Sequence, residues 1–159
     1  MQAADDQEIV TLLQALKIEN NENGNHVCVN KTQQNVLVEA SERGNLSTVR
    51  AILDQAPDVN ALHTRNGWTP LIAAIVNDQT KVWQLLLAHR ADVHIPSNWN
   101  MSPMYMAAMW KRETAINALV DANADINLPS ADSTALHAAV SSSMAKRTLD
   151  STVSLLMNR

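Results

Sequence analysis

Two short motifs recur along this chain in phase, at a spacing of 32 to 34 residues. The first begins with a hydroxyl residue ahead of an apolar run, at Thr69, Ser102 and Thr134. The second begins with an aspartate, at Asp58, Asp92 and Asp125. A unit of this length cannot bury its own apolar face, so neighbouring units have to stack into an array. This period constrains the fold more than any other feature of the sequence.

The most regular unit resembles the ankyrin repeat family. Residues 69–74 read Thr-Pro-Leu-Ile-Ala-Ala, similar to the family's Thr-Pro-Leu-x-x-Ala-Ala motif, and residues 91–94 are similar to its Ala-Asp-Val-Asn motif. The resemblance covers about residue 35 to the end of the chain. It implies an all-α repeat solenoid, that is, an ankyrin array of helix-turn-helix units with β-turn fingers, and a role in binding other proteins.

We divide the chain into residues 1–34 and 35–159. Residues 5–17 predict an amphipathic helix with Ile9, Leu12, Leu13 and Leu16 on one face. This helix also resembles the second helix of a repeat, and we interpret it as a half-repeat that caps the array. A free amphipathic helix that binds a partner is the alternative. The polar residues 19–34 predict a loop.

Residues 35–159 predict about four repeats, of which the first and the last are irregular. The first is degenerate, because Asn35 and Val36 stand in place of Thr-Pro, and we expect Asn35 to cap its first helix. The last is incomplete and carries about five additional residues within 141–151. This insertion predicts a longer loop between its two helices or an extended helix.

Several positions predict a left-handed backbone. Gly44 and Gly67 fit such turns without steric cost. The positions where the resemblance implies further glycines are instead Arg90, Asn100, Lys111 and Asn123. A non-glycine residue in this region, such as Arg90, costs on the order of 1 kcal/mol.

Composition and single motifs exclude several functions. The formal net charge of −4 argues against nucleic acid or an anionic membrane as the main partner. Cys28 is the only cysteine, so no internal disulfide can form, and with His26 it supplies too few ligands for a metal.

A catalytic reading of the fourth repeat is also weak. Asp132, Ser133 and His137 are the residue types of a catalytic triad. They occupy motif positions, however, and no nucleophile elbow accompanies them. We therefore expect no enzyme activity, no metal and no cofactor. Without a signal-peptide pattern or a long apolar run, we expect a cytoplasmic protein, or an exported or periplasmic one if a leader was removed.

The scarce aromatic residues indicate where a partner would bind. The fingers and the exposed ends of the first helices are the positions that packing leaves free to vary, and there we predict partner-binding residues Arg65, Asn66, Trp68, Asn77, Asn98, Trp99, Met101, Met109 and Trp110. Tryptophan, methionine and arginine are enriched in protein interfaces. The alternative is that these tryptophans fold over a neighbouring finger or helix. Trp83 differs, since it lies in the apolar stripe of a second helix and is expected in the core.

The sequence thus predicts a non-catalytic protein-binding module, monomeric when free. It would act through its concave surface as an adaptor, or as an inhibitor of a partner protein. The alternative is that the chain is the targeting portion of a larger enzyme or effector. Binding of a small ligand is disfavoured, because such arrays present an open groove.

Overall fold

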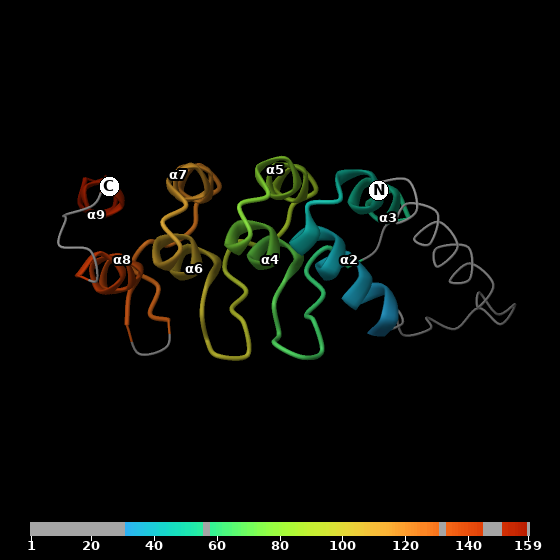
Figure 1. Cartoon of the computed structure of the whole chain (residues 1–159), viewed down its shortest axis with the longest axis horizontal. Helices are drawn as coiled ribbons and strands as arrows, with labels where there is room; N and C mark the ends of the chain where they lie inside the picture. Colours follow the sequence, from blue (N-terminus) through green and yellow to red (C-terminus); the bar gives the residue numbers. More distant parts are fainter. Residues whose placement is uncertain (1–30, 56–57, 131–132, 145–150, 159) are drawn as a thin grey trace, which may run out of the picture.

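The computed structural model describes residues 31–55, 58–130, 133–144 and 151–158. Within these ranges the chain forms pairs of helices that stack side by side in two layers (Figure 1). The helices are α2 (Lys31–Arg43), α3 (Leu46–Leu53), α4 (Pro70–Val76), α5 (Thr80–Ala88), α6 (Pro103–Met109), α7 (Glu113–Asp121), α8 (Ala135–Met144) and α9 (Ser151–Met157). Each consecutive pair is one repeat, numbered one to four, which confirms the predicted all-α ankyrin solenoid.

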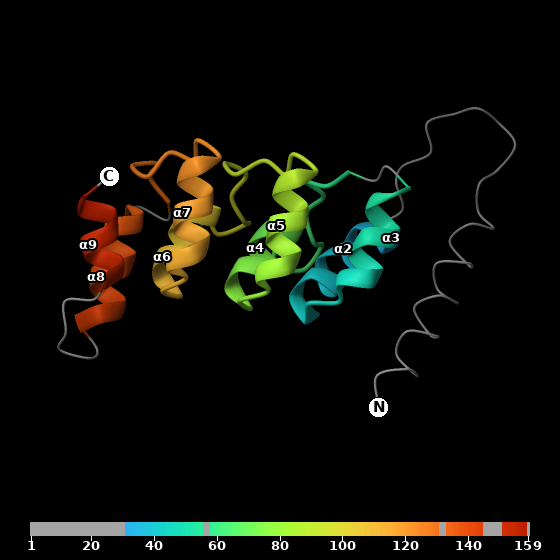
Figure 2. The same cartoon turned by 90° about the horizontal axis from the view of Figure 1, so that it is seen from above.

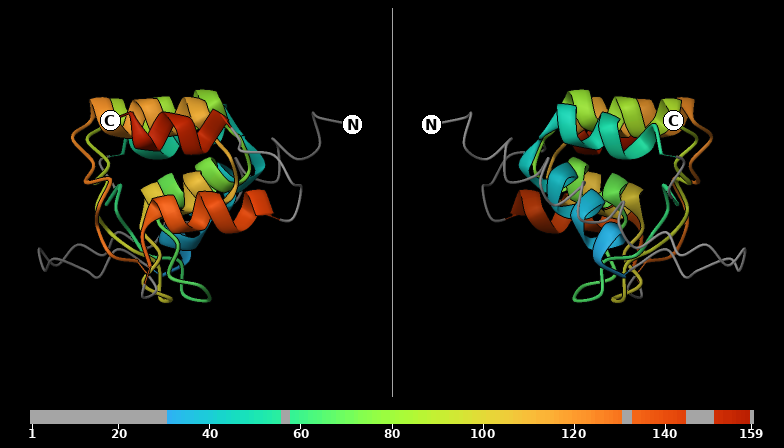
Figure 3. Two further views of the ribbon diagram at one scale, coloured as in Figure 1. Left: turned by 90° about the vertical axis from the view of Figure 1, so that its left-hand side faces the viewer. Right: turned by 90° about the vertical axis from the view of Figure 1, so that its right-hand side faces the viewer.

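The two layers separate the first and second helices of the repeats. The first helices α2, α4, α6 and α8 form one layer, and the second helices α3, α5, α7 and α9 form the other (Figures 1 and 2). The loops that precede α4, α6 and α8 extend away from both layers (Figure 3). We call these loops fingers two, three and four, after the repeat that each one opens.

The first helices of repeats two and three begin as their sequence predicts. Thr69 and Ser102 are extended N-cap residues, and their hydroxyl oxygens accept hydrogen bonds from the backbone N–H groups of Ile72 (3.1 Å) and Tyr105 (3.2 Å). The proline that follows each cap lacks an N–H group that the first helical turn could not satisfy anyway.

One apolar core runs through both layers and all four repeats. Leu71 and Met104 are each 1% exposed, and the alanines that follow them in α4 and α6 are fully buried. Small side chains there let neighbouring helices approach closely. In α5, Trp83 lies in this core, as its position in the apolar stripe predicts.

The start of the array differs from the prediction. Helix α2 begins at Lys31, inside the segment expected to be a loop, so Asn35 lies within the helix and does not cap it. The Asn35 side chain instead reaches finger two, where its Oδ1 accepts from Thr64 N and its Nδ2 donates to Thr64 Oγ1, both at 3.1 Å.

The fourth repeat accommodates part of its insertion by lengthening a helix. Helix α8 has 10 residues, whereas α4 and α6 have 7 each. Of the two predicted alternatives, a longer loop or an extended helix, the length of α8 agrees with the extended helix, and residues 145–150 lie outside the described residues. The predicted N-terminal helix at 5–17, together with His26 and Cys28, lies outside the described residues.

Hydrogen bonds between adjacent repeats recur at one position. At the start of α5, Gln79 Nε2 donates to the carbonyl oxygen of Glu42 (3.3 Å). The equivalent Arg112, before α7, donates from Nη2 to the carbonyl oxygen of Val76 (3.0 Å) and pairs through Nη1 with Asp78 Oδ2 (3.1 Å). Each of these side chains thus satisfies a carbonyl at the end of the preceding repeat's first helix, which has no partner within its own helix.

All six positions predicted to have a left-handed backbone have one, and the structure shows a seventh among the described residues. Gly44, Gly67, Arg90, Asn100, Lys111 and Asn123 all have φ between 55° and 73°. Asp78 joins them with φ 58°. It stands between α4 and α5 at the place that Gly44 takes in repeat one, so the same tight turn is made there by a residue with a side chain.

Replacing Arg90 with glycine is expected to raise the free energy of unfolding by about 0.5–1 kcal/mol. Arg90 is exposed and follows α5 with φ 61°, where glycine has no steric penalty. Urea unfolding followed by circular dichroism measures the change. Arg90→Ala keeps the left-handed penalty and should bring no gain; an equal gain in both variants would contradict this explanation.

Candidate functional site

The fingers and the first helices together form one continuous surface, which we call the finger–helix surface. The fingers project from the layer of first helices, on the side opposite the second helices (Figures 1 and 3). This is the surface that the sequence predicts to be concave and to contact a partner. It carries the predicted partner-binding residues of repeats two and three.

A second apolar cluster lies under this surface, separate from the main core. Its buried members are Ile72 (0% exposed) and Val76 (7%) of α4 and Met106 (4%) of α6. Partly buried side chains from fingers two and three and from α6 pack against them: Trp68, Met101 and Tyr105. The corner between the fingers and the helices of repeats two and three is therefore apolar.

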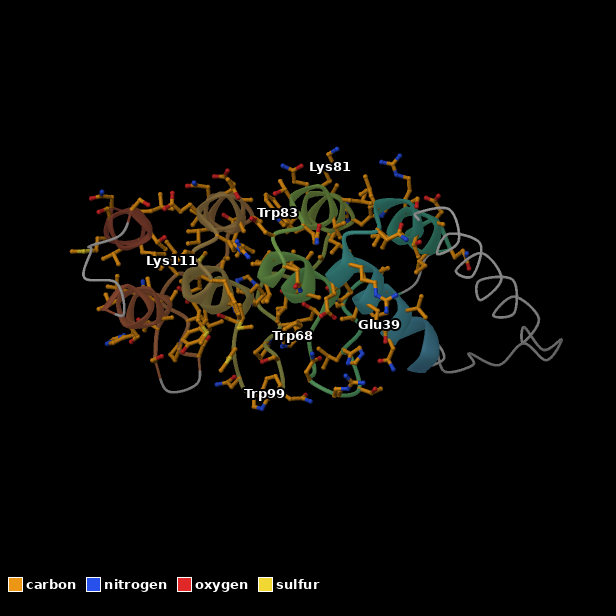
Figure 4. The ribbon with its side chains drawn as sticks, in the orientation of Figure 1. Glu39, Trp68, Lys81, Trp83, Trp99 and Lys111 are labelled. Carbon is orange, nitrogen blue, oxygen red and sulfur yellow. The ribbon has the colours of Figure 1, made fainter. Side chains whose placement is uncertain are left out.

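Trp68, which the sequence analysis predicts as a surface residue of finger two, is half-buried (Figure 4). Its backbone N–H donates to Asn66 Oδ1 (3.0 Å), which orients the residue at the base of finger two. Its indole Nε1 is buried without a hydrogen-bond partner among the described residues. Met101 is also half-buried and packs against the same cluster, so both residues combine packing with a remaining accessible surface.

Three large apolar side chains of repeat three are exposed to solvent. Trp99 is 56% exposed at the tip of finger three (Figure 4), Trp110 is 50% exposed and Met109 42%. Trp110 is the C-cap residue of α6, directly after Met109. Burying such side chains is worth roughly 1.5–3 kcal/mol each, so leaving them in water favours their later burial against another molecule.

The predicted asparagines have mainly structural roles. Asn77 is the C-cap of α4, and its Nδ2 donates to the Ala73 carbonyl (3.0 Å). Asn66 supports Trp68 through its side chain, and its carbonyl accepts from the backbone N–H of Asn98 (3.3 Å), which ties fingers two and three together. The side chains of Asn98 and Arg65 are exposed beside these contacts.

Sequence analysis missed two contributors to this surface. Leu62 of finger two is 43% exposed. An apolar residue is usually expected in the core, so its side chain gave no sign that it lies at the surface. Tyr105 of α6, which the sequence analysis did not mark as a site residue, packs on the second apolar cluster. The spacing of 33 residues between Ile72 and Tyr105 could have indicated that both lie on one row of the stacked helices.

The charge of the surface changes along the array. The positions of α6 occupied by Met106, Met109 and Trp110 correspond to Glu39, Glu42 and Arg43 of α2 in the same repeat alignment. All three α2 side chains are exposed, and Glu39 Oε1 lies 3.9 Å from His63 Nε2. Repeat one is therefore charged where repeat three is apolar.

Of the three residues with catalytic-triad side chains, His137 has a contact that links it to the start of a helix. His137 Nδ1 lies 2.8 Å from Thr134 Oγ1, so this histidine braces the start of α8. Across the described ranges, no group of three or more His, Cys, Asp or Glu side chains could hold a metal. Of the helices described, none is long and apolar enough to cross a membrane.

A cleft of about 530 Å³ lies on the other layer, between α5 and α7. Leu87 and Ala118 contribute apolar atoms, and the rim carries exposed Gln84, Thr114 and Asp121. With an exposed rim, the cleft is a shallow groove between neighbouring repeats and not an enclosed ligand pocket.

Comparison with known proteins agrees with this architecture. A family model described as ankyrin repeats in three copies matches residues 1–97. The matched range includes the N-terminal segment interpreted above as a half-repeat, and that interpretation stays a prediction. Repeats three and four extend the same arrangement of helix pairs beyond the matched residues.

Three relatives share part of the sequence. The human mitochondrial disaggregase is 36% identical over 101 residues, which cover 62% of this chain and 13% of that protein. The putative ankyrin repeat protein YahD of Escherichia coli K12 is 35% identical over 103 residues, 61% of this chain and 51% of the relative. The mouse 2-5A-dependent ribonuclease is 32% identical over 73 residues, 46% of this chain and 10% of the relative. The chain thus spans about half of one relative and about a tenth of the other two.

Proposed function

The chain belongs to the ankyrin repeat family, and from that premise we propose that it is a non-catalytic module that binds another protein on the finger–helix surface of repeats two and three. The observation that carries this proposal is the exposure of Trp99 on finger three and of Met109 and Trp110 at the end of α6. A second apolar cluster, to which Trp68 and Met101 contribute, lies in the same two repeats. Clusters of exposed tryptophan and methionine are typical of interface centres. Arg65, Asn66, Asn77 and Asn98 would surround this centre as a polar rim.

The floor of the site suits an apolar partner segment. Trp68 and Met101 lie over the buried side chains of the second apolar cluster, so they can contribute contact area without large rearrangement. Methionine side chains adapt to irregular surfaces. With Arg65 the only charged residue predicted for the site, we expect the contact to depend little on salt.

Changing Trp99 and Trp110 together to alanine is expected to weaken partner binding at least about a hundredfold, because each interface tryptophan can contribute about 2 kcal/mol or more. Affinity capture from native lysate identifies the partner, and calorimetry with the purified partner measures the affinity.

Lys81→Ala is the matched surface control for this experiment. Lys81 is exposed on α5, on the side of the molecule away from the fingers (Figure 4). It should leave the affinity unchanged, and both variants should unfold cooperatively. Full affinity in the double tryptophan variant would reject this assignment of the site.

Two modes of action fit this surface, an adaptor and an inhibitor. An inhibitor would cover the active site of its partner, so titrating the domain into a partner enzyme would remove turnover in proportion to the domain added. An adaptor would bind with the same affinity and leave turnover intact. Either mode follows from the same contacts, and this titration separates them.

A second candidate function is the targeting portion of a larger enzyme. Two relatives carry the names of enzymes, a disaggregase and a ribonuclease, and this chain matches only 13% and 10% of their lengths. In that case the native transcript would continue past the codon of Arg159 into a catalytic region. A stop codon directly after Arg159 would remove this candidate.

A further inference from the structure

The cleft between α5 and α7 has a cause in the sequence. In the preceding junction, between α3 and α5, Leu46 and Leu85 are half-buried and pack against the main core. Thr80 of α5 and Ala118 of α7 stand at the equivalent positions of the next junction, and both line the cleft. Each of them is smaller than leucine, so less of the space between α5 and α7 is filled than a closely packed junction requires.

The floor of the cleft is apolar, and its walls carry hydrogen-bonding groups. Leu87 and Ala118 are half-buried there, and the core residue Trp83 of the same helix layer lines the cleft as well (Figure 4). Four polar side chains add hydroxyl and amide groups: Thr80, Gln84, Thr114 and Asn117. A groove of this kind suits a side chain that is apolar along its stem and polar at its end.

One end of the cleft is negatively charged. Asp121 is exposed, is the last residue of α7, and is the only charged residue among the eight described residues that line the cleft. It forms no ion pair with any described residue. The carboxyl end of a helix carries partial negative charge, so a carboxylate at this position opposes its own helix and favours a cation beside it.

We propose that this cleft binds an arginine side chain of a partner protein, with the guanidinium on the Asp121 carboxylate and the aliphatic stem on the apolar floor. A guanidinium can donate two parallel hydrogen bonds to one carboxylate, which the ammonium group of lysine cannot do. A purely apolar occupant would cover Asp121 without pairing it, and covering an unpaired charge is unfavourable. The charge of the cleft therefore selects a basic occupant.

The cleft and the finger–helix surface lie on different sides of the molecule. The cleft is formed by second helices, whereas the finger–helix surface is formed by fingers and first helices (Figures 1 and 3). Occupying one surface would leave the other open, so the chain could hold two proteins at once, as an adaptor does. The cleft proposal is independent of the proposed partner site, because none of the residues predicted for that site lines the cleft.

Titration of the 159-residue chain with the peptide acetyl-Gly-Gly-Arg-Gly-Gly-amide, followed by NMR, tests the proposal. We expect saturable chemical-shift changes that are centred on α5 and α7. The Kd should lie at about 1–10 mM, because one side chain supplies only a small part of a full interface. The same peptide with citrulline in place of arginine keeps the shape without the charge, and it should bind at least about fivefold more weakly.

Two variants locate the contact. Asp121→Asn should weaken binding of the arginine peptide at least about fivefold, because it removes the charge and keeps the size of the side chain. Ala118→Leu should abolish binding, because it places a leucine in the cleft where the preceding junction has Leu85. Circular dichroism checks that both variants stay folded, and Asp121→Asn, at an exposed position, carries the test alone if Ala118→Leu does not fold.

Asp54→Asn is the matched control for Asp121→Asn. Asp54 is also exposed and ends α3 at the position equivalent to that of Asp121, but it does not line the cleft. This variant should bind the arginine peptide as the wild type does. The proposal would be overturned by a wild-type chain without saturable binding, or by equal binding of the citrulline peptide. Unchanged binding in Asp121→Asn or in folded Ala118→Leu, or an equal loss in Asp54→Asn, would overturn it as well.

Discussion

Trp83→Ala is expected to lower the free energy of unfolding by about 3–5 kcal/mol, the range for removing a large aromatic side chain from a packed core. Trp83 is 4% exposed and belongs to the cluster that connects all four repeats. Trp83 lines the cleft between α5 and α7, so the vacated space would lie between two neighbouring repeats. A loss of this size is a large fraction of the stability of a domain of this length.

Trp99→Ala is the matched comparison for this loss. The substitution is chemically identical, but Trp99 is 56% exposed, so it should change the free energy of unfolding by less than about 0.5 kcal/mol. Urea unfolding should be followed by far-ultraviolet circular dichroism, because removing a tryptophan alters the fluorescence signal itself. Similar losses in the two variants would contradict the assignment of one indole to the core and the other to the finger tip.

Gly67→Ala is expected to destabilise the array by about 2–4 kcal/mol. Gly67 lies in finger two with φ 63°, and its N–H donates to the His63 carbonyl (2.8 Å). A methyl group added there would meet the side chain of Asn98 and would lie 2.7 Å from the Asn98 backbone nitrogen. Backbone cannot move aside as a side chain can, so fingers two and three would have to separate.

Gly44→Ala separates the two causes of this loss. Gly44 has a similar φ of 73°, but an added methyl group would meet only the end of the Gln79 side chain. The cost there should be the left-handed penalty of about 1–2 kcal/mol, with about 1 kcal/mol more if the displaced Gln79 side chain loses its hydrogen bond to the Glu42 carbonyl. Urea midpoints of the two variants give the difference, and a Gly44 variant as unstable as the Gly67 variant would show that backbone contact between the fingers contributes nothing.

Features that depend on near neighbours in the chain were predictable. A threonine or serine followed by proline begins a helix because its hydroxyl reaches an N–H three residues ahead, and Thr69 and Ser102 do so. Arg90 and Lys111 adopt the left-handed backbone because the turns at those points need it. The core position of Trp83 followed from the helical periodicity of its neighbours.

Contacts between repeats explain where sequence reasoning was wrong or incomplete. Asn35 has the residue type of a helix cap, but it bonds to Thr64 of finger two. Trp68 precedes the cap Thr69 as Met101 precedes the cap Ser102, and both rest on the second apolar cluster, whereas Trp99, two residues before Met101, is 56% exposed. Whether a side chain is exposed depends on a neighbour about 33 residues away, and a local pattern does not describe that neighbour's shape.

The sequence by itself determined the repeat, its period, most of its helix starts and its left-handed turns, because these arise from interactions within a few residues. The tertiary structure alone decided which bulky side chains remain in water. It divides the tryptophans between the core, the corner under the fingers and the open surface. The physical reason is that burial is a property of two stacked units together, and a single repeat carries only half of that information.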